Sequence, residues 1–302
     1  MKNFSPIVLF VYNRPRHTQQ TIEALQKNEL ASESDLIIYS DEAKTVNEQE
    51  NVDKVRLYIE QIDIFNKITI IKREKNWGLA NNIIDGVTKV VDQYGKIIVI
   101  EDDIVTSPYF LKYMNEALDF YKDKNKVWHI SGWNYPIATN ELSDVFLWRV
   151  MNCWGWATWK DRWNFFEKDS DRVIKDFSKQ DIKKFNLDDS ENFFKQVSWN
   201  KEKKINSWAV YWGITIFKKN GLCLNPAQSF VENIGNDGIG TSPATDMFKS
   251  ERNISLIRKI NFISDISENQ IAVSRIKSFF KDSKKSIFQR IINRIKKIIG
   301  LK

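Results

Sequence analysis

The first 125 residues alternate between short apolar runs and longer segments with helical periodicity. An unbroken apolar run bounded by turn residues is typical of a strand buried on both faces, and apolar residues three or four apart are typical of an amphipathic helix. Strands are predicted at residues 5–13, 35–43, 67–76 and 95–103. Helices are predicted between and after them, at residues 18–28, 51–62, 79–94 and 107–123. This alternation predicts an α/β fold with a mostly parallel sheet and right-handed crossovers.

The pattern weakens after about residue 125, where tryptophans become frequent. We therefore expect residues 1–125 to form one half of a domain and residues 126–270 to form a second half built around a cleft. A hydrophobic content of 42% is enough for a sizeable core. No apolar run is long enough to span a bilayer, and the apolar N-terminal run lacks the cleavage site of a signal peptide. Cys153 and Cys223 lack metal or redox spacing, so we expect buried thiols.

Positive charge is concentrated at the C-terminus. Residues 271–302 contain ten Lys or Arg and one Asp, a net charge of +9, while the whole chain is +7, so the first 270 residues sum to −2. The tail also places apolar residues on one broad helical face: Ile287, Phe288, Ile291, Ile292, Ile295, Ile298 and Ile299. A basic amphipathic helix of this kind is typical of binding to an anionic membrane surface. A terminal helix docked on the protein or a partner, and a nucleic-acid-binding arm, are the alternatives.

Polar side chains follow each of the four predicted strands, where an open α/β sheet binds its ligands. The third strand ends in Asn76-Trp77-Gly78, and the fourth in three consecutive acids, Glu101, Asp102 and Asp103. Neither a GxGxxG nor a GxxxxGK[ST] motif follows any strand, so a bound nucleotide needs another partner for its phosphates. Carboxylates that leave room for phosphate oxygens and water are how proteins hold Mg²⁺ or Mn²⁺.

Several motifs resemble those of one enzyme family. The segment IIVIEDDIVTSPYFLKYMNEAL resembles the acidic metal motif of GT-A glycosyltransferases, in particular N-acetylglucosaminyltransferase I and related bacterial enzymes of capsule, O-antigen and lipooligosaccharide synthesis. PIVLFVYNRP, YSDEAK, REKNWGLANNI, SGWN and the GW of NCWGWATW match in the same order, and the resemblance covers roughly residues 5–245. The resemblance implies a Rossmann-like GT-A fold and inverting sugar transfer from a nucleotide donor, usually UDP-linked, with Mn²⁺ or Mg²⁺.

The resemblance also implies roles for individual residues of the donor site. Asp103 would ligate the metal, Asp102 would meet the ribose or the metal's water shell, and Glu101 would support both. Asp41 would accept a hydrogen bond from uracil, and the remaining expected nucleotide contacts are Arg14, Asn76 and Asn81. Each has a plainer interpretation, because a strand-end acid is often a helix cap or turn residue and Arg14 could pair with a surface acid.

The acceptor site and the catalytic base are the least defined parts. Aromatic rings stack on sugars, so Trp133, Trp154 and Trp156 are candidate acceptor residues, although tryptophan is also a common core residue. The related enzyme carries a WDDW-like segment where this chain reads NSWAVYWG, and Ala and Val there cannot take a proton. The nearest downstream acids are Glu232 and Asp237, and the Asn-Asp-Gly around Asp237 is equally an ordinary turn signal. With two histidines, at positions 17 and 129, the late histidine ligand of many GT-A enzymes is absent or replaced.

Together these patterns predict a metal-dependent inverting glycosyltransferase of cell-surface polysaccharide synthesis. Its acceptor would be a saccharide or a lipid-linked saccharide. It would lie in the cytoplasm, attached peripherally to the inner face of the cell membrane through residues 271–302. The alternatives are a catalytically inactive nucleotide-sugar-binding or scaffold protein and a basic-tailed nucleic-acid binder. The acidic body disfavours the latter, and we expect no nucleic-acid partner.

Overall fold

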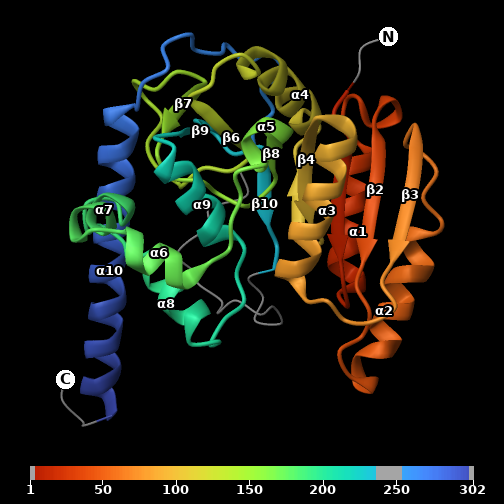
Figure 1. The fold of residues 1–302 in the computed structure, drawn as a ribbon, viewed down its shortest axis with the longest axis horizontal. Helices are drawn as coiled ribbons and strands as arrows, with labels where there is room; N and C mark the ends of the chain where they lie inside the picture. Colours follow the sequence, from red (N-terminus) through yellow and green to blue (C-terminus); the bar gives the residue numbers. More distant parts are fainter. Residues whose placement is uncertain (1–3, 236–253, 299–302) are drawn as a thin grey trace.

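The computed structural model describes residues 4–235 and 254–298, with side chains up to residue 284. An eight-stranded sheet forms its centre, in the order β3-β2-β1-β4-β8-β6-β9-β7 (Figure 1). The strands of the first half are mutually parallel: β1 (Ile7–Val11), β2 (Asp35–Ser40), β3 (Lys67–Lys72) and β4 (Lys96–Glu101). The second half adds β6 (Val127–Ser131), β7 (Val145–Trp148), β8 (Trp156–Trp159) and β9 (Leu222–Pro226). Since β8 lies antiparallel to β4, the sheet continues across the boundary expected at residue 125.

The helices of the first half follow the predicted alternation. They are α1 (Pro15–Gln26), the short 3₁₀ helix η1 (Ala31–Glu33), α2 (Val46–Ile59), α3 (Leu79–Tyr94) and α4 (Phe110–Tyr121). α1 and α2 pack together on one face of the sheet, and α3 lies on the other, as right-handed crossovers require (Figure 1). The predicted mixed, mostly parallel α/β fold is confirmed, although each strand ends earlier than expected because its polar end leaves the sheet as a loop.

Smaller elements cover the second half. They are α5 (Lys160–Trp163), α6 (Ser170–Asp176), α7 (Lys179–Phe185), α8 (Lys195–Lys201) and α9 (Ala209–Lys218). A separate two-stranded antiparallel sheet pairs β5 (Ile104–Thr106) with β10 (Val231–Asn233). β5 begins immediately after Asp103, the last of the three acids at the end of β4, so this ribbon continues from the predicted donor site.

The long helix α10 (Gln270–Ile298) lies at the side of the molecule opposite β3 (Figure 1). Its first turns are not a detached tail, because Ala272, Val273, Ile276 and Phe280 are buried in the main core. Among the described residues, no helix is both long and apolar enough to cross a bilayer. The boundary expected at residue 271 therefore falls inside the packed fold.

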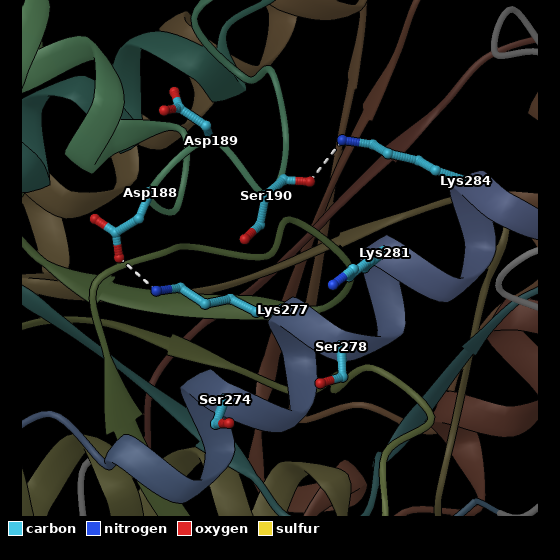
Figure 2. Close-up of a pocket in the computed structure, with 8 residues that line it drawn as sticks. All are labelled: Asp188, Asp189, Ser190, Ser274, Lys277, Ser278, Lys281 and Lys284. Atoms are coloured by element: carbon cyan, nitrogen blue, oxygen red, sulfur yellow. Dashed lines mark hydrogen bonds and ion pairs between the residues drawn. The ribbon is translucent and has the colours of Figure 1, made fainter.

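Several basic residues of α10 contact the body of the protein. The groove between α10 and residues 188–190 has a volume of about 530 Å³ (Figure 2). Across it, Lys277 pairs with Asp188 and Lys284 donates to the Ser190 carbonyl. Arg275, nearer the start of the helix than Lys277, pairs with Glu141. These contacts attach the helix to the body, and Arg275, Lys277 and Lys284 each have a partner within the protein.

We predict that Ile276→Ala lowers the free energy of unfolding by about 2–5 kcal/mol, because it opens a cavity in the core. Ile271→Ala is the matched control: the same deletion, five residues earlier on the same helix, at a side chain that is 42% exposed. It should cost less than about 1 kcal/mol. Urea unfolding of both variants measures the difference. Equal small effects would mean that α10 is detached from the body in solution.

Candidate functional site

The three acids at the end of β4, Glu101, Asp102 and Asp103, lie beside Arg14, which precedes α1. β1 and β4 are neighbours in the sheet, with Phe10 opposite Glu101, so the loop after β1 and the acids after β4 meet at one edge. Nη2 of Arg14 donates to Oδ1 of Asp102 and to Oδ2 of Asp103, the latter at 2.9 Å. Thr21 of α1 adds a hydrogen bond from its hydroxyl to the Asp102 carbonyl, 2.9 Å long. The structure thus brings together four of the predicted donor-site residues.

Burial strongly affects the charges of this carboxylate cluster. Burial is the main cause that raises the pKa of Glu101 to about 8. The charges of Asp103 and Asp102 contribute to that rise, and Arg14 opposes it. Burial also raises the pKa of Asp102 to about 6, although Arg14 and the backbone N–H of Tyr12 favour the ionised form. Burial lowers the pKa of Arg14, but the charges of Asp102 and Asp103 outweigh that effect and raise it overall. One guanidinium therefore does not neutralise three carboxylates, and the cluster favours a further cation.

The cluster fits a divalent ion that shares its coordination with a ligand. Mg²⁺ in such sites is held by one or two carboxylates, with phosphate oxygens and water completing the shell. Within the described residues, no three His, Cys, Asp or Glu side chains converge into a complete cage. Asp103 has the more exposed carboxylate, 13% against 6% for Asp102. Asp103 is thus the better placed of the two to ligate an ion.

A glycine that sequence reasoning missed closes one side of the cluster. The ribbon of β5 and β10 continues into a hydrogen bond of 2.9 Å from the Ile234 N–H to the Asp103 carbonyl. This brings Gly235 so close that a Cβ built on it would lie 2.2 Å from Oδ2 of Asp103 and 2.9 Å from Nη1 of Arg14. Any side chain at position 235 would have to displace the Asp103 carboxylate. Nothing local marks this glycine, because the approach depends on the pairing of β5 with β10.

Asp41 joins two loops at the ends of β2 and β3. It is buried, and its carboxylate accepts hydrogen bonds from the backbone N–H groups of Trp77 (2.9 Å), Gly78 (2.9 Å) and Glu42 (3.0 Å). Gly78 begins α3 with a φ of +70°, which permits this turn. Since a carboxylate has about four acceptor positions, about one is left for a ligand.

The two predicted asparagines support the same loops. Nδ2 of Asn76 donates to the Glu42 carbonyl at 2.6 Å, and Nδ2 of Asn81 donates to the Trp77 carbonyl at 2.8 Å. Arg73, which sequence reasoning overlooked, lies over the Trp77 ring, 4.0 Å from its centroid, and bonds to Asp85. Asn76 and Asn81 therefore use their side-chain Nδ2 groups to hold the loops after β2 and β3.

The three candidate acceptor tryptophans fall into different environments. Trp156 is fully buried and stacks on Trp208, with ring centroids 5.0 Å apart. Because its ring has no exposed surface, we do not place it in an acceptor site. Trp133 is largely buried, and Trp154 is half-buried against it, with centroids 4.6 Å apart.

The loop that carries Trp154 lies beside the carboxylates. Burial raises the pKa of Cys153 to about 12, and the charges of Glu101 and Asp103 contribute to that rise. His129 holds this loop through the Asn152 carbonyl. Its Nδ1 accepts a hydrogen bond from the Trp212 indole N–H, so its Nε2 carries the proton and donates to that carbonyl, 2.9 Å away. Burial lowers the pKa of His129 to about 4, which keeps it neutral near pH 7. His129 thus positions a loop and is not placed as a metal ligand.

The two candidate bases are placed unequally. Glu232 lies in β10, opposite Val105 of β5, and is partly exposed near the carboxylate cluster. Asp237 lies outside the described residues. Ala209, at the position where the related enzyme carries acids, begins α9 and packs against the core.

An open α/β sheet binds its ligands at the carboxyl ends of its strands, and here that edge carries a buried acidic cluster. Residues 7–189 match the family model for Glycosyl transferase family 2, which covers more than half of the sequence. The chain belongs to this family and is a glycosyltransferase that uses a nucleotide-sugar donor.

Two solved structures illustrate the similarity of this chain to known structures. Mannosyltransferase PcManGT from Pyrobaculum calidifontis, in complex with GDP-Man and Mn²⁺, is 9% identical, with 72% of this chain and 69% of that chain covered and a TM-score of 0.41. S. aureus TarS 1–349 in complex with UDP is 8% identical, with 76% of this chain and 59% of that chain covered and a TM-score of 0.42. Similarity at this level says nothing about the ligands of this chain. The search of curated proteins found no match.

We predict that Gly235→Ala weakens Mn²⁺-dependent nucleotide binding at least about tenfold, because its Cβ displaces the Asp103 carboxylate. Gly213→Ala is the control, since a Cβ at that helical position meets nothing closer than 3.6 Å. Calorimetric titration with UDP and Mn²⁺ measures both. If Gly235→Ala binds UDP with Mn²⁺ as tightly as the wild type, nucleotide binding does not depend on the present position of the Asp103 carboxylate.

Proposed function

We propose that this glycosyltransferase is metal-dependent and inverting, and that it moves a sugar from a UDP-linked donor to a saccharide or lipid-linked saccharide in cell-surface polysaccharide synthesis. The observation that carries the proposal is the contact of Arg14 with both Asp102 and Asp103 at the carboxyl edge of the sheet. A buried acidic cluster next to a cationic side chain suits a ligand that contains a diphosphate and a divalent cation. The motif resemblance to N-acetylglucosaminyltransferase I supports the narrower assignment within the family.

The donor would lie across the edge formed by the ends of β1, β2 and β4. Asp103 would ligate Mn²⁺ or Mg²⁺, and the bound ion would neutralise charge that develops on the departing diphosphate. Asp102 would orient Arg14 and meet the ribose or a metal-bound water, while Glu101 supports the cluster from the end of β4. Asp41, with its one remaining acceptor position, would receive the N–H of the uracil ring.

The acceptor would approach from the loop that carries Trp154. The Trp154 ring, packed edge-on against Trp133, would offer an apolar face to a sugar ring beside Cys153 and the carboxylates. A carboxylate must take the proton of the attacking hydroxyl. Asp237 is our candidate for that base, with Glu232 as the alternative because β10 carries it close to the cluster.

Membrane attachment is proposed for the last part of the chain. Residues 285–302 contain six Lys or Arg and no acid, and the apolar positions of the predicted amphipathic face all lie within them. Earlier basic residues of the expected tail, such as Lys277 and Lys284, are engaged with the body (Figure 2). The membrane-binding segment is therefore shorter than the sequence pattern alone indicates.

The metal assignment predicts that Asp103→Asn abolishes Mn²⁺-dependent UDP binding, because the amide removes the charge that holds the ion. Asp63→Asn makes the same change at an exposed position and should bind UDP normally. Calorimetric titration with and without Mn²⁺ is the measurement. Unchanged UDP affinity of Asp103→Asn in the presence of Mn²⁺ would contradict the assignment of Asp103 as a metal ligand.

The base assignment predicts that Asp237→Asn lowers turnover by about 10²–10⁴-fold while UDP binding stays intact. Glu232→Gln, made in parallel, tests the alternative carboxylate. UDP release with a purified acceptor measures turnover. Near-normal turnover in Asp237→Asn together with a large loss in Glu232→Gln would identify Glu232 as the catalytic base. Tight UDP binding without any sugar transfer by the wild-type protein would favour the catalytically inactive alternative.

The tail assignment predicts that a chain ending at residue 284 loses sedimentation with anionic vesicles, since each basic residue near such a surface contributes about 1 kcal/mol. It should keep UDP binding, because every residue assigned to the donor lies before it. Neutral vesicles serve as the control. Continued binding of the shortened protein to anionic vesicles would place the membrane contact elsewhere.

A further inference from the structure

Arg14 contacts the same two carboxylates that the proposed function assigns to the metal and its water shell. A single nitrogen, Nη2, donates to Oδ1 of Asp102 and Oδ2 of Asp103. The residue is anchored at its backbone, because its carbonyl accepts from the N–H and the hydroxyl of Thr18, both at 3.0 Å. Its side chain is 18% exposed, so a ligand can reach part of it.

A guanidinium in this position competes with a divalent ion. It fills an acceptor position on each carboxylate, and its positive charge repels a second cation at the same oxygens. Gly235 packs against the pair, so the Asp103 carboxylate has little freedom to turn away from Arg14 and meet an ion elsewhere. An ion that arrives by itself must therefore share Asp103 with Arg14 or displace it.

A nucleotide diphosphate changes this balance. Its oxygens match the planar donor fork of arginine, so the guanidinium gains an anionic partner other than the carboxylates. The same diphosphate supplies ligands that the protein does not provide to the ion. Arg14 would exchange the carboxylates for the diphosphate by a movement of its partly exposed side chain, while Thr18 holds its backbone.

We propose that Arg14 is a built-in competitor for the metal, which makes binding of Mn²⁺ or Mg²⁺ depend on the donor diphosphate. This inference rests on the proposed function and adds an order to it: the ion binds firmly only together with the nucleotide. Bridging of the ion by diphosphate would by itself also produce cooperative binding. It would not, however, make the affinity for the ion alone depend on residue 14.

The test is a titration of Mn²⁺ followed by electron paramagnetic resonance at pH 8, with and without UDP, on wild-type protein and Arg14→Met. We expect the variant to bind Mn²⁺ alone about tenfold more tightly, within the range of ordinary coupling between sites. The factor by which UDP tightens Mn²⁺ binding should fall by a similar amount. Arg16→Met is the matched control: it removes the same charge two residues away, at an exposed side chain, and should change neither quantity.

Unchanged or weaker binding of Mn²⁺ alone by folded Arg14→Met overturns the inference, and the proposed function survives if UDP and Mn²⁺ still bind together to the wild type. Failure of the wild type to bind Mn²⁺ even with UDP overturns both. If Arg14→Met does not fold, Arg14→Gln replaces it, because the amide removes the positive charge and keeps a hydrogen-bond donor for the carboxylates. A gain in affinity for Mn²⁺ alone then supports competition, and no gain contradicts it.

Discussion

Three adjacent carboxylates at the end of a buried strand are the constraint on which this structure depends. Burial and mutual repulsion disfavour their ionised forms, as the raised pKa values of Glu101 and Asp102 indicate. Arg14 offsets part of that charge through its contacts with Asp102 and Asp103. In the proposed function, the remaining negative charge would hold a divalent ion, and that ion would bind the donor diphosphate in place of a glycine-rich loop, which follows no strand here.

The sheet order makes this balance possible. Arg14 and Asp102 are 88 residues apart, but they meet because β1 and β4 are neighbours in the sheet. Where β4 ends, the chain turns into β5, and the pairing of β5 with β10 brings Gly235 against the Asp103 carboxylate. His129 then fixes the loop of Cys153 and Trp154 through the Asn152 carbonyl. Each wall of the site is thus held by a contact between segments distant in the sequence.

Local patterns predicted the main strands and helices of the first half and the acidic cluster, because strand runs, helical periodicity and strand-end charges are readable from neighbouring residues. They did not predict which groups would meet. Trp156 matches a family motif, but it lies on β8 between two strands and has no exposed surface. The start of α10 reads as a basic tail, yet Ile276 and Phe280 complete the core of the second half. Gly235 and Arg73 carry no local signal at all, since their importance arises from contacts that only the folded chain creates.

The most direct test of the central claim is the position of a metal ion in crystals grown with Mn²⁺ and UDP. Anomalous diffraction locates Mn²⁺ without reference to any assumed ligand. The account predicts a peak in contact with the Asp103 carboxylate, with the UDP diphosphate on its other side and the Arg14 guanidinium turned toward the phosphates. A peak away from the ends of β1 and β4, or UDP bound there without any ion, would contradict it.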